Sequence, residues 1–447
     1  MRISFHGACR EVSGSCFLIE TAGKKILFDC GLFQGSKLAE ERNFAPFSFD
    51  PKSLDAVVIC HAHLDHTGRL PKLVKDGFAG KIFGTVPTKE LAKLVLDDNE
   101  KLMREEAQRE KTPILYTKND INRTMQLFIT ILYNEKLEIA PGVSLTLKNA
   151  GHILGSAIAV FEAEGKKVVY TSDLGNTPSL LLDPAEFIDS ADYVISESTY
   201  GGRSHEDIRR RQEKLAQVIN ETIRENGVLL IPAFAIERTQ ELLHDIEHLS
   251  ILGNCEAPAF FLDSPLAAKV TAVFEKYPEY LSERLREFHK NLDFFRFERL
   301  RITSSVEESK SIAEQPNPKV IIAGSGMMNG GRILHHAQKY LENEKNALLF
   351  VSYQAAGSLG RRLFEGDRQV KIFGHKIQVR AKVESIRSYS SHADLPQLIN
   401  WLSKIKGVKN IFIVHGEVEQ ALVFSGEIKR QLNIETIIPQ QEEEHML

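Results

Sequence analysis

The segment HAHLDH occupies residues 61–66 and contains three histidines and an aspartate. Imidazole nitrogen and carboxylate oxygen are ligands that zinc and similar ions take in proteins. His61 and His63 are two residues apart, so both rings can face one ion if they lie just beyond the end of a strand. Asp65 and His66 lie about one helical turn further along and cannot easily reach the same ion without strain. The spacing therefore predicts two adjacent metal ions.

Further candidate ligands follow other predicted strands. Two ions about 3.5–4 Å apart need more ligands than one segment supplies, and usually a bridging group. His152 in NAGHILGS, Asp173 in YTSDLG and His415 in FIVHGE each follow an apolar run and precede a glycine or a turn. A lone histidine at a strand end is more often structural than ligating. Histidine and aspartate crowded as in HAHLDH, in contrast, need a cation or other partners when they are buried.

The apolar runs indicate the strands that must position these residues. Four strands are predicted before residue 64, from RISFHGA, SCFLIE, KKILFDCG and LDAVVICHAH. Four more are predicted further along, from VSLTLKNAGH, SAIAVFEAEG, KKVVYTSDLG and ADYVISEST. Residues 88–136 lie between the two groups and are predicted to be helical, because LAKLVL and MQLFITIL place apolar residues at helical spacing.

From about Gly202 the pattern changes. Charged helical stretches now alternate with single apolar strands, which predicts a parallel sheet. The strands are GVLLIPAFA, APAFFLDSP, PKVIIAGSG and NALLFVSYQ. After about His375 short strands return in HKIQVRAKVESI, followed by a helix in PQLINWLSKI and a strand in NIFIVHGE. We therefore predict one domain formed by residues 1–202 and 376–447, with an α/β domain of residues 203–375 inserted into it.

The length and composition of the chain limit the classes of function that are expected. The chain has 447 residues, which suggests more than one domain. Its net charge of -4 argues against coating nucleic acid by bulk attraction. No apolar run approaches the ~18 residues of a membrane span, and the N-terminus lacks an apolar signal core, so no membrane contact is expected. Five cysteines without a CxxC pair are typical of reduced thiols in a cytoplasmic protein.

Ten motifs together resemble one known family. They are DCG (29–31), HAHLDHTG, GHILGSA, TSDLGN, ESTYG (197–201), PAFAIERTQELL, DSPLA, SGMMNGGRILHH, SSHAD (390–394) and HGE (415–417). In these motifs the chain resembles the β-CASP branch of the metallo-β-lactamase superfamily. The resemblance is strongest to the endonuclease subunit of the cleavage and polyadenylation specificity factor and its bacterial and archaeal homologues. It implies a four-layer αββα sandwich with an inserted parallel-sheet α/β domain.

The resemblance also implies a role for each motif residue. It implies two Zn²⁺ ions, with Asp173 bridging them and Asp29 orienting ligating groups. One ion would be held by His61, His63 and His152, and the other by Asp65, His66 and His415. The three motifs of the β-CASP branch are matched by Glu197, His392 and His415.

The implied reaction is hydrolysis of an RNA phosphodiester bond. Zinc lowers the pKa of bound water to near 7, so a hydroxide that bridges the two ions is the expected nucleophile. His392 is the candidate general acid for the leaving 3′-oxygen, and Glu197 would fix its tautomer and keep it protonated. We expect endonucleolytic cleavage of single-stranded RNA that leaves 5′-phosphate and 3′-hydroxyl ends.

Candidate substrate contacts lie mainly in the inserted domain. The glycine-rich SGMMNGGR could hold phosphate through backbone N–H groups, although such loops are often simple turns. Arg332, His335 and His336 follow it and could contact the RNA backbone, while a solvated helix face explains the histidine pair equally well. Ser391 in SSHAD completes the predicted set. The run RRR at 209–211 is predicted to be a solvated helix face.

Several alternatives remain open from the sequence. They are a 5′-exoribonuclease or DNA nuclease of the same family, a small-molecule hydrolase of the wider superfamily, and a non-catalytic RNA-binding subunit. A histidine at 415 favours RNA, because DNA nucleases of this family typically lack it. The inserted domain argues against small substrates, and the full ligand set argues against a non-catalytic subunit. No KH domain is expected, since the first predicted strand begins at residue 2. A monomer or homodimer is expected, without a predicted protein partner.

Overall fold

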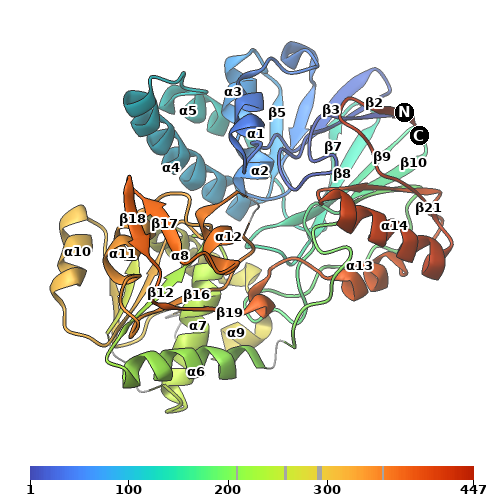
Figure 1. Cartoon of the computed structure of the whole chain (residues 1–447). Helices are drawn as coiled ribbons and strands as arrows, with labels where there is room; N and C mark the ends of the chain where they lie inside the picture. The colour runs from blue at the N-terminus through green and yellow to red at the C-terminus, as the bar shows by residue number, and fades with distance from the viewer. Residues whose placement is uncertain (208–209, 256–258, 289–293, 355–356) are drawn as a thin grey trace. The chain divides into compact units, whose positions relative to one another are not determined.

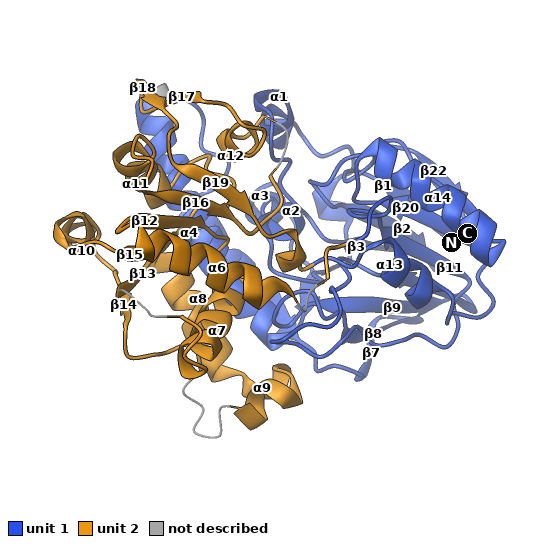
Figure 2. Ribbon diagram, turned by 60° about the horizontal axis from the view of Figure 1, so that its bottom comes forward, with its two compact units in different colours: residues 1–204, 392–447 blue, residues 205–391 orange. Residues whose placement is uncertain are grey.

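The computed structural model describes residues 1–207, 210–255, 259–288, 294–354 and 357–447 (Figure 1). The chain forms two compact units, coloured separately in Figure 2. The first unit comprises residues 1–204 and 392–447, and the second comprises residues 205–391. Among the described residues, no helix combines the length and apolar character needed to cross a membrane.

Two seven-stranded sheets form the centre of the first unit. The first sheet has the order β22-β1-β2-β3-β4-β5-β6, and its strands from β3 to β6 run parallel to one another. Its strands are β1 (Arg2–Phe5), β2 (Phe17–Thr21), β3 (Lys24–Phe28), β4 (Ala56–Val58), β5 (Lys81–Gly84), β6 (Phe128–Thr130) and β22 (Glu444–Met446).

The second sheet has the order β21-β20-β11-β10-β9-β8-β7. Its strands from β10 to β21 in this order run parallel, so their carboxyl ends lie at one edge of the sheet. Its strands are β7 (Lys136–Ala140), β8 (Val143–Asn149), β9 (Ala157–Ala163), β10 (Lys166–Tyr170), β11 (Tyr193–Glu197), β20 (Asn410–Val414) and β21 (Glu435–Ile437).

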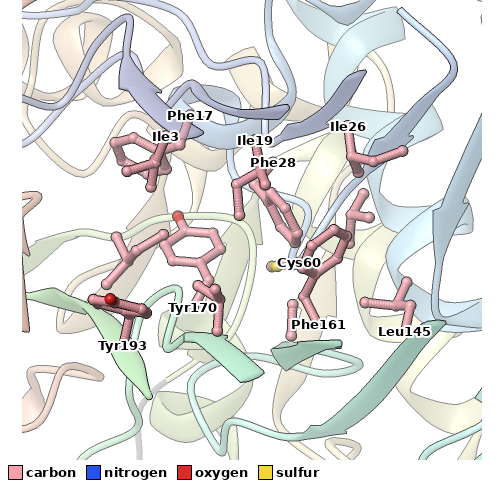
Figure 3. Close-up of a cluster of buried hydrophobic side chains, with 14 of the residues drawn as sticks. Ile3, Phe17, Ile19, Ile26, Phe28, Cys60, Leu145, Phe161, Tyr170 and Tyr193 are labelled. Atoms are coloured by element: carbon pink, nitrogen blue, oxygen red, sulfur yellow. The ribbon is translucent and has the colours of Figure 1, made fainter. Parts of the chain in front are cut away.

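The two sheets pack face to face around an aromatic core (Figure 3). Phe28 on β3 meets Phe161 on β9 with ring centroids 5.6 Å apart, and Phe17 on β2 meets Tyr170 on β10 at 5.3 Å. Side chains alternate between the two faces of a strand, so Leu18, the neighbour of Phe17, packs in the core on the opposite face of its sheet.

Helices cover both outer faces of this sandwich. Leu18 packs in one core with Leu70 and Leu73, which lie on a helix over the first sheet. Ile411 packs with Leu398 and Phe424 from two helices over the second sheet. The helices on the first sheet are α2 (Leu64–Thr67), α3 (Leu70–Lys75), α4 (Val86–Glu110) and α5 (Lys118–Leu127), and those on the second are α13 (Leu395–Leu402) and α14 (Val418–Leu432). The predicted four-layer αββα sandwich is confirmed.

One helix prediction is wrong at the C-terminal end of the segment. MQLFITIL was expected to be helical, but α5 ends at Leu127 and residues Phe128–Thr130 form β6, which pairs parallel with β5. Phe128 is buried in the core beneath the helices, whereas Ile129 is exposed. This alternation, with a β-branched residue on the exposed side, suits the edge of a sheet.

The second unit contains a six-stranded sheet in which every strand runs parallel to its neighbours. This confirms the predicted parallel-sheet α/β domain. The strands, in sheet order, are β14 (Leu300–Ile302), β13 (Ala259–Asp263), β15 (Lys319–Ala323), β12 (Val228–Pro232), β16 (Ala347–Phe350) and β19 (Lys382–Ser385). Its longer helices are α6 (Arg211–Arg224), α7 (Arg238–Ile251), α8 (Pro265–Lys276) and α11 (Arg332–Tyr340).

The chain returns to the first unit later than the predicted residue 376. The strand β18 (His375–Gln378) pairs with β17 (Gln369–Ile372), and β19 extends the parallel sheet beside β16. The short strands in HKIQVRAKVESI therefore belong to the second unit, and the first unit resumes at His392. The amino-acid pattern of these strands resembles that of the sandwich, which explains the difference.

The predicted solvated face at RRR is wrong for Arg211. Arg209 lies outside the described residues, but Arg211 is buried, and its Nε lies 2.9 Å from Asp245 Oδ2. The ring of Tyr389 lies 4.4 Å from the same guanidinium. A charged run therefore supplies an interior ion pair of the second unit.

Candidate metal centre

The predicted ligands meet at the carboxyl ends of strands in the first unit. His61 follows β4, His152 follows β8, Asp173 follows β10 and His415 comes directly after β20. Glu197 is the last residue of β11. Loops at the carboxyl ends of neighbouring parallel strands converge, so residues far apart in the sequence lie close together here.

Three residues at these strand ends have an unusual backbone. Asp29, Ser172 and His415 have φ angles of 56°, 50° and 49°, in the left-handed region that side chains other than glycine rarely adopt. Residues in such conformations concentrate at functional sites, because the surrounding structure must hold them there. The unusual backbone conformations therefore lie in the same place as the candidate metal ligands.

One group of donor atoms contains His61, His63, His152 and Asp173. His63 Nδ1 lies 3.2 Å from His61 Nε2 and 3.3 Å from His152 Nε2. Asp173 Oδ2 lies 3.4 Å from His61 Nε2 and 3.5 Å from His152 Nε2. Tetrahedral ligands of zinc, with bonds of about 2.0–2.1 Å, are separated by about 3.3–3.4 Å. The four side chains could therefore hold one ion.

A second group contains Asp65, His66 and His415. His66 Nε2 and His415 Nε2 lie 3.4 and 3.6 Å from Asp173 Oδ1, the other oxygen of that carboxylate. This oxygen is buried and has no hydrogen-bond partner among the described residues. A buried carboxylate oxygen is costly when nothing neutralises it. The residues present therefore fit a pair of cations, with one oxygen of Asp173 facing each group.

Asp29 orients one candidate ligand, His66, through the ring nitrogen that faces away from the metal position. His66 Nδ1 donates to Asp29 Oδ2 at 2.7 Å, and the Tyr170 hydroxyl donates to the same oxygen at 2.8 Å. The backbone N–H of Cys60 donates to Asp29 Oδ1 at 2.9 Å. Such a contact fixes which ring nitrogen of His66 faces the metal position.

Two serines contact two of the other rings, and neither serine was predicted from the sequence. Ser172 Oγ lies 3.1 Å from His61 Nδ1, and Ser15 Oγ lies 3.0 Å from His415 Nδ1. Ser172 could have been suspected from its place beside Asp173. Ser15 offers no such signal, because it is 400 residues from His415 along the chain.

Burial sets the protonation of most of these rings. It lowers the pKa of His61 well below its ordinary value and the pKa of His63 and of His415 to about 4. For His66 burial also opposes the charge, but the Asp173 and Asp29 carboxylates outweigh it and raise its pKa well above the ordinary value. A ligating imidazole must be neutral, so three rings are ready for metal and His66 would release a proton.

His392 and Glu197 form a pair beside the metal position. His392 Nδ1 lies 3.2 Å from Glu197 Oε2, and Glu197 is fully buried and accepts the backbone N–H of Leu174 at 2.6 Å. Burial disfavours a charged His392 ring, but the Glu197 carboxylate outweighs this effect and raises its pKa to about 9. Donor atoms of Asp173, Glu197 and His392 lie within 4.8 Å of one another.

The predicted RNA-contacting residues of α11 are engaged within the second unit. Arg332 Nη1 and His336 Nε2 each lie 2.7 Å from an oxygen of Asp263. His336 is buried, whereas His335 is exposed and its ring lies 4.6 Å from that of Phe373. Ser391 is half-buried and ends the second unit. Their contact with RNA stays a prediction.

Three family descriptions match the chain in turn. Metallo-beta-lactamase superfamily matches residues 9–225, Beta-Casp domain matches 239–363, and Zn-dependent metallo-hydrolase RNA specificity domain matches 376–439. The first and third describe metallo-enzymes, and the buried His and Asp groups supply donors for a divalent metal.

Curated relatives cover almost all of the chain. Ribonuclease TTHA0252 of Thermus thermophilus is 39% identical over 424 residues, which are 94% of each protein. Transcription termination factor FttA of Methanocaldococcus jannaschii is 35% identical over 457 residues, covering 98% of this chain and 70% of that protein. A crystal structure of a protein of unknown function from Enterococcus faecalis V583 covers 100% of this chain with a TM-score of 0.58 and 12% identity, which supports the fold alone. The chain therefore belongs to the β-CASP family of the metallo-β-lactamase superfamily.

Proposed function

We propose that the protein is a metal-dependent ribonuclease that hydrolyses phosphodiester bonds within single-stranded RNA. The observation that carries the proposal is the arrangement of six His and Asp donors in two groups around Asp173, with the His392–Glu197 pair beside them. The 39% identity to a protein named as a ribonuclease supports RNA as the substrate. Five free, buried cysteines support a reducing, cytoplasmic location.

The donor set favours two zinc ions. His61, His63 and His152 would hold one ion, Asp65, His66 and His415 the other, and Asp173 would contact both. Imidazole and carboxylate ligands suit zinc. When bound, such ions lower the pKa of water toward neutrality and offset the charge that gathers on phosphate oxygens.

The protein's own contribution to the chemistry is proton transfer. His392 holds its proton at neutral pH because of Glu197, and that contact uses Nδ1, so Nε2 is the atom that would donate to the leaving 3′-oxygen. The backbone N–H groups of Leu174 and Thr199 fix the two oxygens of Glu197. The products would be 5′-phosphate and 3′-hydroxyl ends.

RNA contacts in the second unit form part of this proposal. Arg332 and His336 already bind Asp263, so the charge of Arg332 is partly offset and His336 Nε2 already has a partner. Exposed His335, with its ring against Phe373, is the residue of the predicted set most open to solvent. Ser391 is next to His392 in the chain, and it would contact the phosphate whose leaving oxygen His392 protonates.

The direct test uses metal-loaded protein and single-stranded RNA or DNA labelled at the 5′ or 3′ end. We expect internal cleavage of RNA with 3′-hydroxyl products. Stepwise loss from the 5′ end would instead identify an exonuclease, and preference for DNA would identify a DNA nuclease. Hydrolysis of small thioesters or lactams without RNA cleavage would overturn the proposal.

The general-acid assignment has its own test in His392→Ala. We expect RNA cleavage to fall by about 10²–10⁴-fold, the range of general-acid contributions, with metal content unchanged. Bis(4-nitrophenyl) phosphate is the matched substrate, because its nitrophenolate leaves without a proton, and its hydrolysis should persist. Wild-type RNA cleavage by this variant, with metal content unchanged, would remove the assignment.

A further inference from the structure

Arg69 is a buried cation of the first unit and is 6% exposed. None of the carboxylates in the described part of the chain lies within ion-pair distance of it, and its Nη2 has no hydrogen-bond partner there. The Glu11 carboxylate is near enough to interact with the Arg69 charge, but it pairs directly with Arg42. A buried cation without a direct ion pair is costly, so its retention calls for an explanation. Its guanidinium lies instead 4.5 Å from the ring of Phe33 and 5.3 Å from the ring of Phe47.

Arg69 is bonded to the loop that follows Asp29. Its Nε donates to the Gly31 carbonyl at 2.5 Å, and its backbone N–H donates to the Cys30 carbonyl at 2.8 Å. A Cβ on Gly31 would lie 1.5 Å from the Asp65 carbonyl oxygen, so this loop packs directly on the ligand segment. Arg69 therefore stabilises a close backbone contact that only glycine at position 31 allows.

Three segments meet at this point, which we call the Gly31 junction and define as residues 13–15, 29–32 and 64–66. The Gly31 N–H donates to the Ser15 carbonyl, and the Ser15 N–H donates to the Asp65 carbonyl, each at 2.9 Å. The Cys30 N–H donates to the His66 carbonyl at 2.8 Å. The backbones of Asp65 and His66 are thus fixed by the junction.

The junction also supports the side chains of the same metal group. Ser15 holds His415 Nδ1, and Asp29, next to Cys30, holds His66 Nδ1. Phe33 reinforces it, because a Cβ on Gly14 would lie 2.4 Å from the Phe33 ring that Arg69 contacts. These contacts support Asp65, His66 and His415, although Asp29 also accepts the N–H of Cys60, the residue before His61.

The side chain of His61 and the backbone of His152, in the other metal group, rest on different supports. His61 Nδ1 lies against Ser172, and the backbone N–H of His152 donates to Ser156 Oγ at 3.0 Å. Neither serine belongs to the Gly31 junction. A disturbance of the junction should therefore affect the two groups unequally.

We propose that Arg69 is a positioning residue that maintains the Asp65, His66 and His415 group selectively, by holding the Gly31 junction closed. The inference rests on the proposed two-ion centre. Residues that orient metal ligands typically contribute 10–100-fold to metal affinity, so loss of Arg69 should weaken one of the two sites by about that factor.

The test is the metal content of Arg69→Met, which removes the charge and the Nε donor but keeps an unbranched side chain. After dialysis against a low zinc concentration, native mass spectrometry should find one ion per chain, where the wild type holds two. Lys72→Met is the matched control. Lys72 lies 4.2 Å from the Phe47 ring of the same cluster but pairs with Asp76 rather than with the junction. The control should hold two ions.

Ser15→Ala provides a second, milder variant if Arg69→Met folds poorly. It removes the hydroxyl on His415 without touching Arg69, and should also weaken one site. Two ions bound with wild-type affinity in a folded Arg69→Met or in Ser15→Ala would overturn the inference, as would equal weakening of both sites. A wild-type protein that binds fewer than two ions would instead count against the proposed function.

Discussion

Asp173 and Asp263 are both buried aspartates at the carboxyl ends of parallel strands, one in each unit, yet their surroundings differ. The oxygens of Asp263 accept four hydrogen bonds of 2.5–2.7 Å, from Thr303, Ser309, Arg332 and His336. Asp173 is instead surrounded by histidine nitrogens at 3.4–3.6 Å, and its Oδ1 has no hydrogen-bond partner among the described residues.

The difference indicates that the hydrogen-bonding capacity of Asp263 is met by the protein itself, whereas Asp173 is arranged to bind metal ions. Burial opposes the charge of Asp263, but His336, Ser309, Thr303 and Arg332 hold its pKa well below the usual range. Asp263 therefore needs no further ligand and contributes to stability. The longer and incomplete contacts of Asp173 leave room for cations between the side chains. Position at a strand end alone does not distinguish the two roles.

The largest effect is expected from Asp173→Asn. Removing the charge shared by both metal groups should lower RNA cleavage by about 10³-fold or more, because metal-ion catalysis supplies several kcal/mol. The measurement is the initial rate on labelled RNA at fixed zinc. Asp192→Asn is the control. Asp192 lies just before β11, at the opposite end of the strands, where it pairs with Lys409, and its loss should leave the rate near that of the wild type. Equal rates for Asp173→Asn and the control would show that Asp173 is no more important for cleavage than Asp192.

Asp263→Asn should act on stability instead. Removing one partner of a buried ion pair costs about 3–5 kcal/mol, because Arg332 loses its counterion, and His336 also loses its hydrogen-bond partner. A clearly lower midpoint of denaturant unfolding is expected. Asp367→Asn breaks an exposed pair with Arg362 and should cost about 0–1 kcal/mol. If both variants unfolded at the same denaturant concentration, Asp263 would not stabilise the unit as described.

A smaller effect concerns pH. The pKa of Asp263 is lower in the folded protein than the ~3.9 of an unfolded chain, so its contribution is fully present above about pH 5. The contribution is lost as the pH falls through the folded value. The difference in unfolding midpoint between the wild type and Asp263→Asn should therefore be constant from about pH 5 to 7 and shrink below about pH 4. A difference that grows on acidification would contradict this sign.

The strands, and the clustering of the candidate metal donors beyond their carboxyl ends, could be predicted from the sequence, because the segments that carry the donors follow apolar runs that had to be buried. The contacts that hold the donors could not. Ser15 and Arg69 act through backbone junctions between distant segments, which leave no local pattern. Arg211 looked solvated because charge alone does not reveal a buried partner. The strand β19 was assigned to the wrong sheet, because short strands carry little information about their neighbours.

The most direct test of the account is the number of ions bound per chain, measured by native mass spectrometry for the wild type, Asp173→Asn and Asp263→Asn in the same zinc buffer. We expect two ions in the wild type and in Asp263→Asn, and at most one in Asp173→Asn. Two ions in Asp173→Asn, or fewer than two in the wild type, would contradict this expectation.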